Sequence, residues 1–95
     1  MSASSAPNAP GVYMIENAAN GRVYIGKTKN LGKRFGQHVT QLRKGKHHNT
    51  RLQAEWSEFG EPTFTFRVHV LAGESEIDLI EQTLIAENMG DGCFN

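Results

Sequence analysis

Two short segments near the start of the chain constrain its fold more than any other feature. Residues 11–13 read Gly-Val-Tyr and residues 24–26 read Tyr-Ile-Gly, within runs rich in β-branched and aromatic residues. Asn20 and Gly21 between the runs form a typical turn signal. The pattern predicts a β-hairpin, in which Tyr13 and Tyr24 lie on neighbouring strands within reach of each other.

The elements after the hairpin follow from hydrophobic spacing and capping residues. Asn30 is expected to cap a helix that runs to about residue 42, and a second helix starts near Asn49 and stops at residues 60–62, Gly-Glu-Pro. A strand over residues 64–71 and a helix over residues 75–88 follow. We expect one face of that strand to carry four apolar residues: Phe64, Phe66, Val68 and Val70. The order β-β-α-α-β-α predicts an α+β fold, an α/β sandwich with a small three-stranded, mostly antiparallel sheet flanked by helices.

Length and composition indicate a single domain. A chain of 95 residues, 38% of them hydrophobic, is long enough for one core and too short for two. We expect a flexible tail over residues 1–9 and one domain over residues 10–95. A lone Cys93 excludes an intrachain disulfide. No run approaches the roughly 20 apolar residues of a membrane span, so a cytoplasmic chain without membrane contact is expected.

The charges are segregated along the chain although the net charge is zero. Nine basic residues and no acidic residue lie between Arg22 and Arg51, and nine of the ten acidic residues follow Leu52. The distribution predicts one basic face for a polyanion and one acidic face turned elsewhere. A solvated surface with clustered charges is the alternative.

The last predicted helix contains a carboxylate on its apolar face. At 100° per residue, Glu81 falls in the arc formed by Ile77, Ile80 and Leu84. Burying an ionised carboxylate costs on the order of several kcal/mol unless a cation or strong hydrogen bonds compensate the lost hydration. A hard divalent cation such as Mg²⁺ would do so. A partly exposed Glu81, or a salt bridge with Arg34, is the alternative.

Arg34 and His38 are four residues apart on one flank of the first predicted helix, so both can project over the edge of the sheet. A guanidinium can contact two phosphate oxygens and stabilise the added charge of a pentavalent transition state. A phenol has a pKa near 10, and a metal ion or Arg34 could lower it enough for a tyrosine to accept a proton from water. Taken singly, an arginine, a histidine or a tyrosine in such a position is more often structural or solvated than catalytic.

These residues together resemble the signature of the GIY-YIG nucleases, which hydrolyse nucleic-acid phosphodiesters with one divalent metal ion. The resemblance covers residues 11–95 and is strongest to the intron-encoded and phage branch, with Val12 in place of isoleucine. The matching positions are residues 11–13, 24–27, 33–35, 38, 45–47, 52–53, 81 and 94–95.

The resemblance implies a role for each matched residue. Tyr13 would be the general base or its close partner, and Tyr24 would orient the water or the phosphate. Arg34 would stabilise the transition state, and Glu81 would be the sole protein ligand of the metal. His38 would support the phosphate or relay the proton from Tyr13.

Further residues are expected around this centre. Four basic residues are expected to contact the substrate: Lys27, Lys33, His47 and Arg51. Three residues are expected to support the site: Gly11, Gly26 and Asn95. In the family the asparagine is buried and ties the end of the chain to the site by hydrogen bonds.

The resemblance implies a metal-dependent endonuclease that hydrolyses DNA and leaves 5′-phosphate and 3′-hydroxyl ends. One Mg²⁺ or Mn²⁺ ion per site is expected. The substrate is single- or double-stranded DNA, and the chain is expected to be a monomer or a weak dimer.

Three other interpretations stay open. The chain could be a nucleic-acid-binding module that keeps the fold without the chemistry. It could be a zinc protein that uses three histidines, His38, His47 and His48, although no cysteine or carboxylate pair joins them at zinc-ligand spacing. It could also be a small basic interaction domain, whose binding would lack the steep salt dependence of phosphate contacts.

Overall fold

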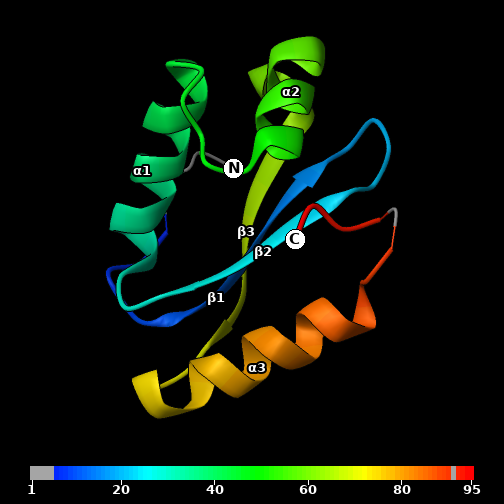
Figure 1. Cartoon of the computed structure of the whole chain (residues 1–95). Helices are drawn as coiled ribbons and strands as arrows, with labels where there is room; N and C mark the ends of the chain where they lie inside the picture. Colours follow the sequence, from blue (N-terminus) through cyan, green and yellow to red (C-terminus); the bar gives the residue numbers. More distant parts are fainter. Residues whose placement is uncertain (1–5, 91) are drawn as a thin grey trace.

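The predicted order of elements is present in the structure, a computed structural model that describes residues 6–90 and 92–95. The elements are β1 (Gly11–Asn17), β2 (Val23–Thr28), α1 (Leu31–Arg43), α2 (Thr50–Phe59), a 3₁₀ helix η2 (Glu61–Thr63), β3 (Phe64–Leu71) and α3 (Glu74–Glu87). The strands form one sheet in the order β2-β1-β3, with both pairings antiparallel (Figure 1). The α+β class is therefore confirmed.

Local signals in the sequence explain where these elements begin and end. The side chain of Asn30 accepts a hydrogen bond from the amide of Lys33 at 3.0 Å, and that of Asn49 accepts one from Leu52 at 3.0 Å. Both contacts satisfy a donor that the first turn of a helix leaves unpaired. Gly21 in the hairpin turn has a φ of 74°, a conformation that favours glycine.

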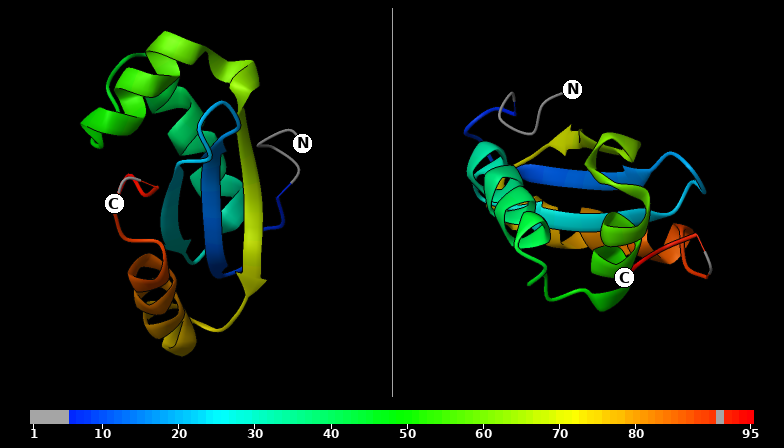
Figure 2. Two further views of the ribbon diagram at one scale, coloured as in Figure 1. Left: turned by 90° about the vertical axis from the view of Figure 1, so that its right-hand side faces the viewer. Right: turned by 90° about the horizontal axis from the view of Figure 1, so that it is seen from above.

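The helices cover the two faces of the sheet. Helices α1 and α2 lie on one face and α3 lies on the other (Figures 1 and 2). The first core contains Tyr13, Ile15, Phe35, Leu52 and Trp56, among others. The second core lies between the sheet and α3, and its buried members are Val12, Met14, Val23, Ile25, Ile77, Leu84 and Cys93. Alternation along the strands thus directs both tyrosines toward α1 and α2.

One expected residue lies on the opposite face from the prediction. Val68 packs against the first core, but Val70 packs against the second core, under α3. The register between β1 and β3 shifts between Val12 and Tyr13, which pair with Val70 and Val68. Such an irregularity inserts a residue and reverses the side-chain alternation, so simple spacing could not predict it.

The described part of the N-terminal segment lies against the start of α1. The amide of Leu31 donates to the carbonyl of Ala9 at 3.0 Å, and that of Gly32 donates to the carbonyl of Pro7 at 3.0 Å. The first five residues of the expected tail lie outside the described residues, and the boundary at residue 10 stays a prediction. None of the helices in the described ranges has the length and apolar character needed to cross a membrane.

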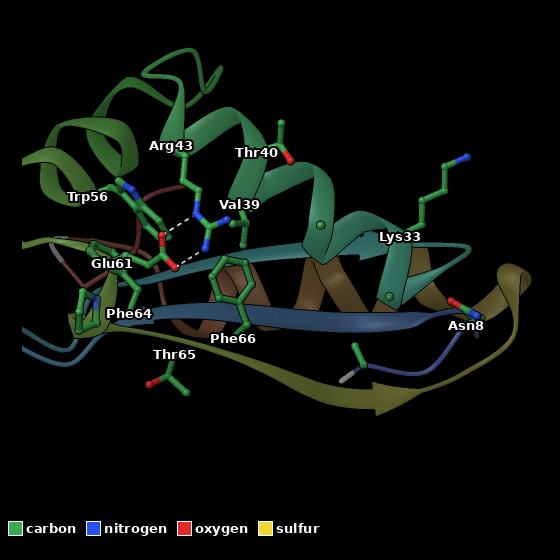
Figure 3. Close-up of a pocket in the computed structure, with 14 residues that line it drawn as sticks. Asn8, Lys33, Val39, Thr40, Arg43, Trp56, Glu61, Phe64, Thr65 and Phe66 are labelled. Atoms are coloured by element: carbon green, nitrogen blue, oxygen red, sulfur yellow. Dashed lines mark hydrogen bonds and ion pairs between the residues drawn. The ribbon is translucent and has the colours of Figure 1, made fainter. Parts of the chain in front are cut away.

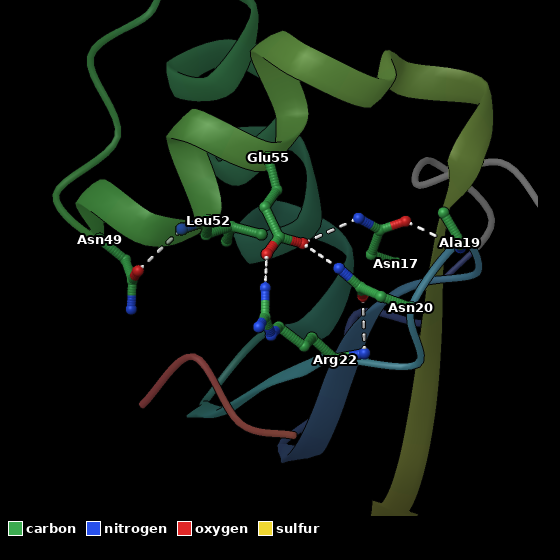
Figure 4. Close-up of polar contacts among 7 residues, drawn as sticks. All are labelled: Asn17, Ala19, Asn20, Arg22, Asn49, Leu52 and Glu55. Atoms are coloured by element: carbon green, nitrogen blue, oxygen red, sulfur yellow. Dashed lines mark hydrogen bonds and ion pairs between the residues drawn. The ribbon is translucent and has the colours of Figure 1, made fainter. Parts of the chain in front are cut away.

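A buried carboxylate joins the hairpin turn to α2. Glu55 is 8% exposed and accepts hydrogen bonds from the side chains of Asn17 and Asn20, each at 2.8 Å (Figure 4). Its other oxygen pairs with Arg22. Burial alone would raise the pKa of Glu55, but the hydrogen bonds and the positive charge lower it. This network fixes α2 relative to the β1–β2 hairpin.

Candidate active site

Tyr13 lies at the centre of the site, on the face of β1 that α1 and α2 cover. Its hydroxyl lies 2.6 Å from Nε2 of His38, which is fully buried on α1. Gly26 stands opposite Tyr13 on β2, and a Cβ atom there would lie 2.8 Å from Cε1 of the Tyr13 ring. At Gly11 a Cβ atom would lie 2.9 Å from a methyl group of Leu31. Both glycines therefore let side chains approach the strands closely.

Two further histidines extend the contact from His38 to the loop before α2. Nδ1 of His38 lies 2.7 Å from Nε2 of His47, and Nδ1 of His47 accepts the amide hydrogen of Asn49 at 3.0 Å. His47 is buried, and its ring stacks on that of His48 with centroids 4.4 Å apart. Nε2 of His48 lies 3.2 Å from the hydroxyl of Tyr24. Each tyrosine is therefore paired with its own histidine.

The surroundings keep the two inner histidines neutral. Burial lowers the pKa of His38 to about 2, and the charges of Arg34, His47 and His48 act in the same direction. Burial also lowers the pKa of His47 to about 4. A charged imidazolium inside the core would lose its hydration, and no neighbouring carboxylate among the described residues compensates that loss, so the neutral form is favoured.

The positive charge of Arg34 acts on both tyrosines. It is half-buried on α1, and its guanidinium donates a hydrogen bond to Oε1 of Gln37 at 3.1 Å. Burial raises the pKa of Tyr13 and of Tyr24, whereas the nearby positive charge of Arg34 lowers both values. In the free domain the effect of burial is the larger one, so both phenols are protonated at neutral pH.

Glu81 approaches the same cluster from α3, across the edge of β2. The carboxylate is half-buried, and burial raises its pKa. Asp78, one turn earlier, raises that pKa further, while Lys27 on β2 lowers it. Lys27 forms an ion pair with Asp78. Among the ion pairs of the described residues none joins Glu81 to Arg34, so the alternative salt bridge expected between them is not formed.

Asn95 ties the end of the chain to β2. Its side chain accepts the amide hydrogen of Ile25 at 2.7 Å and donates to the carbonyl of Ile25 at 2.8 Å. The expectation of a buried asparagine is wrong, because the residue as a whole is exposed. The hydrogen bonds that were expected of it are nevertheless present, and they complete the edge of β2 beside Tyr24.

Two of the expected substrate-binding residues lie outside this cluster. Arg51 is exposed in the first turn of α2. Lys33 lines a separate groove of about 1090 Å³ between α1 and β3, over Trp56 and Phe66 (Figure 3). None of the tyrosines, histidines or Glu81 lines that groove. The groove is therefore separate from the cluster in which the ionisable groups meet.

The segregation of charges along the sequence is only partly kept in the folded chain. Four of the nine basic residues between Arg22 and Arg51 pair with acidic residues from the second half of the chain. One of these acids, Glu55, is buried rather than part of an acidic face. Folding thus brings oppositely charged residues from the two halves of the chain into contact. The basic residues in these pairs are Arg22, Lys27, Lys29 and Arg43.

The sequence profile of the GIY-YIG catalytic domain matches residues 9–89. The chain belongs to the GIY-YIG family. It is 38% identical to intron-associated endonuclease 1 of Enterobacteria phage T4 over 50 residues, which are 53% of this chain and 20% of that protein. It is 39% identical to UvrABC system protein C of Mesorhizobium japonicum over 79 residues, which are 83% of this chain and 10% of that protein. The chain thus spans a tenth to a fifth of the length of these relatives.

Solved GIY-YIG domains have the same fold. The catalytic domain of the homing endonuclease I-TevI superposes with a TM-score of 0.80 at 28% identity, and the match covers 90% of this chain and 96% of that one. The GIY-YIG domain of UvrC from Thermotoga maritima, bound to its catalytic divalent cation magnesium, superposes with a TM-score of 0.59 at 26% identity. That match covers 88% of this chain and 82% of that one.

The residues around Glu81 fit a magnesium ion of the kind bound by the UvrC domain. The half-buried carboxylate of Glu81 lies near a second acidic residue, Asp78, and among the described residues Lys27 is the one basic residue that lowers its pKa. A bound cation would therefore compensate negative charge at this position. Mg²⁺ prefers oxygen ligands, keeps several waters and needs only one or two carboxylates besides a substrate phosphate. A zinc site does not fit, because both ring nitrogens of His38 already contact Tyr13 and His47. The described residues also contain no group of three side chains suited to a metal.

Sequence reasoning missed two residues that lie next to the expected site residues. His48 was considered only as a zinc ligand, but it lies against Tyr24. Asp78 was not considered, although it precedes Glu81 by three residues and therefore shares its helix face. The adjacency of His48 to His47, and that helical spacing, were the available signals.

Proposed function

We propose that this GIY-YIG domain is a divalent-cation-dependent endonuclease that hydrolyses DNA phosphodiester bonds at the cluster around Tyr13. The observation that carries the proposal is the convergence of two phenols, a guanidinium and a carboxylate around the neighbouring strands β1 and β2. The charges of Arg34 and of Glu81 both shift the pKa values of Tyr13 and Tyr24. Perturbed groups that converge in this way are typical of catalytic sites.

Arg34 is proposed to bind the scissile phosphate. Its planar guanidinium can donate two parallel hydrogen bonds to non-bridging oxygens, and its permanent charge stabilises the additional negative charge of the transition state. Removal of one such electrostatic contact typically lowers the rate by about 10²- to 10³-fold. Lys27, next to Glu81, is proposed to add a phosphate contact when substrate displaces Asp78 from their exposed ion pair.

Tyr13 is proposed to accept the proton of the attacking water, and Tyr24 to orient that water or the phosphate. Tyr13 first releases its own proton to solvent, and the water oxygen then forms a bond to phosphorus while the water proton passes to the phenolate oxygen of Tyr13. The bond between phosphorus and the 3′-oxygen breaks, and the 3′-oxygen takes a proton from solvent. The products are a 5′-phosphate and a 3′-hydroxyl. Because burial raises the pKa of Tyr13, this step depends on the positive charge of Arg34.

Glu81 is proposed to hold the divalent cation as its single protein ligand. A bound Mg²⁺ or Mn²⁺ would polarise the phosphate and stabilise the charge on the leaving oxygen. One site cuts one strand, so cutting of the second strand would need a dimer or a second encounter. The proposed substrate is DNA, single- or double-stranded.

Replacement of Arg34 tests the proposal against a matched control on the same helix. The Arg34→Ala variant should lose cleavage of labelled DNA in Mg²⁺ by at least about 100-fold. Arg43→Ala removes the same charge from α1, where Arg43 pairs with Glu61 at 2.7 Å on the side of the groove, and should cleave nearly as fast as the unmodified protein.

Equal rates in the Arg34→Ala and Arg43→Ala variants, with unchanged circular dichroism, would contradict the role of Arg34. Binding of DNA by the unmodified protein without any cleavage would favour the alternative, a nucleic-acid-binding module that keeps the fold. The salt dependence of binding separates that module from a protein-interaction domain, because each phosphate contact releases counterions.

A further inference from the structure

The histidines behind Tyr13 form a hydrogen-bond chain that has a direction. The chain starts at the backbone amide of Asn49, which lies 3.0 Å from Nδ1 of His47. It continues through His47 Nε2 to His38 Nδ1 at 2.7 Å, and from His38 Nε2 to the hydroxyl oxygen of Tyr13 at 2.6 Å. A backbone amide can only donate, so the first contact sets the sense of those that follow.

The position of each ring hydrogen follows from that first donor. A neutral imidazole has one N–H and one acceptor nitrogen. Because Nδ1 of His47 accepts from Asn49, its hydrogen is on Nε2 and is donated to Nδ1 of His38. The hydrogen of His38 is then on Nε2, facing Tyr13. Burial, which lowers the pKa of His38 to about 2 and that of His47 to about 4, keeps both rings neutral.

We propose that His38 donates a hydrogen bond to the oxygen of Tyr13, and so stabilises its phenolate instead of removing its proton. His38 and His47 are then positioning residues that act through Tyr13. The amide of Asn49 fixes their tautomers. This inference rests on the proposed function of Tyr13 as the group that accepts a proton from water.

The opposite direction of the chain leaves a buried clash. If the hydroxyl of Tyr13 donated to Nε2 of His38, the hydrogen of His38 would be on Nδ1 and would point at Nε2 of His47. The hydrogen of His47 would then have to be on Nδ1, directly against the amide hydrogen of Asn49. Two buried donors facing each other cost on the order of 1–3 kcal/mol for each unsatisfied group.

Arg34 strengthens the same polarity. The positive charge of its guanidinium lies close enough to Tyr13 to lower the pKa of the phenol. The hydrogen bond from His38 and the attraction of Arg34 both become stronger when the oxygen of Tyr13 is charged. The arrangement resembles an oxyanion hole, placed around the enzyme's own base.

The tautomers can be measured directly in the unmodified protein. Nitrogen-15 NMR of the histidine side chains at pH 7 distinguishes a ring protonated at Nε2 from one protonated at Nδ1. We expect both His38 and His47 to be protonated at Nε2 alone. A hydrogen on Nδ1 of His38 would overturn the inference. The measurement needs no cleavage, so its failure is distinguishable from failure of the proposed function.

A pair of substitutions tests the consequence for the rate. In His38→Gln the amide nitrogen replaces Nε2 as a donor, but an amide cannot accept a proton as a base. In His38→Leu an apolar side chain of similar size fills the buried position without a donor. We expect cleavage by the Gln variant within tenfold of the unmodified protein, and a loss of about 100-fold in the Leu variant.

Equal losses in the Gln and Leu variants, at comparable melting temperatures, would show that a hydrogen-bond donor at this position does not restore the rate and would overturn the proposal. Rescue by Gln is not expected of a residue that only fills space. If either variant fails to fold, the tautomers of the unmodified protein still decide the direction of the chain.

Discussion

Replacement of Gly26 by alanine should displace Tyr13 while leaving every ionisable residue of the site in place. Gly26 faces Tyr13 across the β1–β2 pair, and a Cβ atom would lie 2.8 Å from Cε1 of the ring and closer still to its hydroxyl end. Carbon atoms in contact are normally about 3.5–4.0 Å apart. The ring of Tyr13 is 1% exposed, so it cannot simply turn into solvent.

The expected displacement can be converted into a rate. To restore normal contact, the hydroxyl end of Tyr13 must move by about 1 Å. The hydrogen bond to His38, now 2.6 Å, would lengthen to a distance at which it no longer counts as one. A misplacement of about 1 Å in a reacting group typically costs about 100-fold in rate. We therefore expect Gly26→Ala to lose about 100-fold in cleavage rate.

The assay is single-turnover cleavage of labelled DNA, with Gly36→Ala as the control. A Cβ atom at Gly36, on the exposed side of α1, has no neighbour within 4 Å. Alanine there should raise stability by roughly 1 kcal/mol, because glycine is a poor helix former, and should leave cleavage unchanged. Unaltered cleavage by folded Gly26→Ala would refute the argument that Tyr13 must sit within hydrogen-bond distance of His38.

Two further predictions concern stability. The folded pKa values of His38 (about 2) and His47 (about 4) lie below the ordinary 6.5, so the unfolded chain binds more protons between pH 6.5 and pH 4. The free energy of unfolding should therefore fall as the pH falls through this window, by up to about 1.4 kcal/mol per pH unit for each histidine. Urea titrations at pH 7 and pH 5 measure how steeply the free energy of unfolding depends on pH. The His38→Gln variant should lose about half of this dependence. An unchanged dependence in the variant would contradict a buried, neutral His38 ring. Glu55→Gln replaces a carboxylate that accepts from two asparagines and pairs with Arg22, and should cost about 1–3 kcal/mol. Thermal melting followed by the fluorescence of the neighbouring Trp56 tests this, and an unchanged melting temperature would be inconsistent with the network.

Elements whose signals are local could be predicted from the sequence. The caps Asn30 and Asn49 mark the helix starts because each side chain bonds an amide three residues ahead. The turn at Gly21 is similarly local. The placement of Glu81 on α3 also followed from helical spacing alone.

Features that depend on contacts between distant segments could not be predicted. The irregularity that moves Val70 to the α3 side depends on how β1 pairs with β3, about 55 residues later by sequence numbering. The burial of Glu55 depends on amides in the hairpin turn. The pairing of Tyr24 with His48 depends on the path of the loop before α2. Each needs the tertiary structure, because side-chain chemistry alone does not specify the partner.

Cleavage of labelled DNA by the unmodified protein and by Glu81→Ala, in Mg²⁺ and in EDTA, tests the central claim most directly. Glu87→Ala, an exposed carboxylate near the end of the same helix, is the matched control. The account predicts cleavage in Mg²⁺ by the unmodified protein and the control, and none in EDTA or by folded Glu81→Ala. Cleavage that persists in Glu81→Ala, or that is indifferent to EDTA, would contradict it.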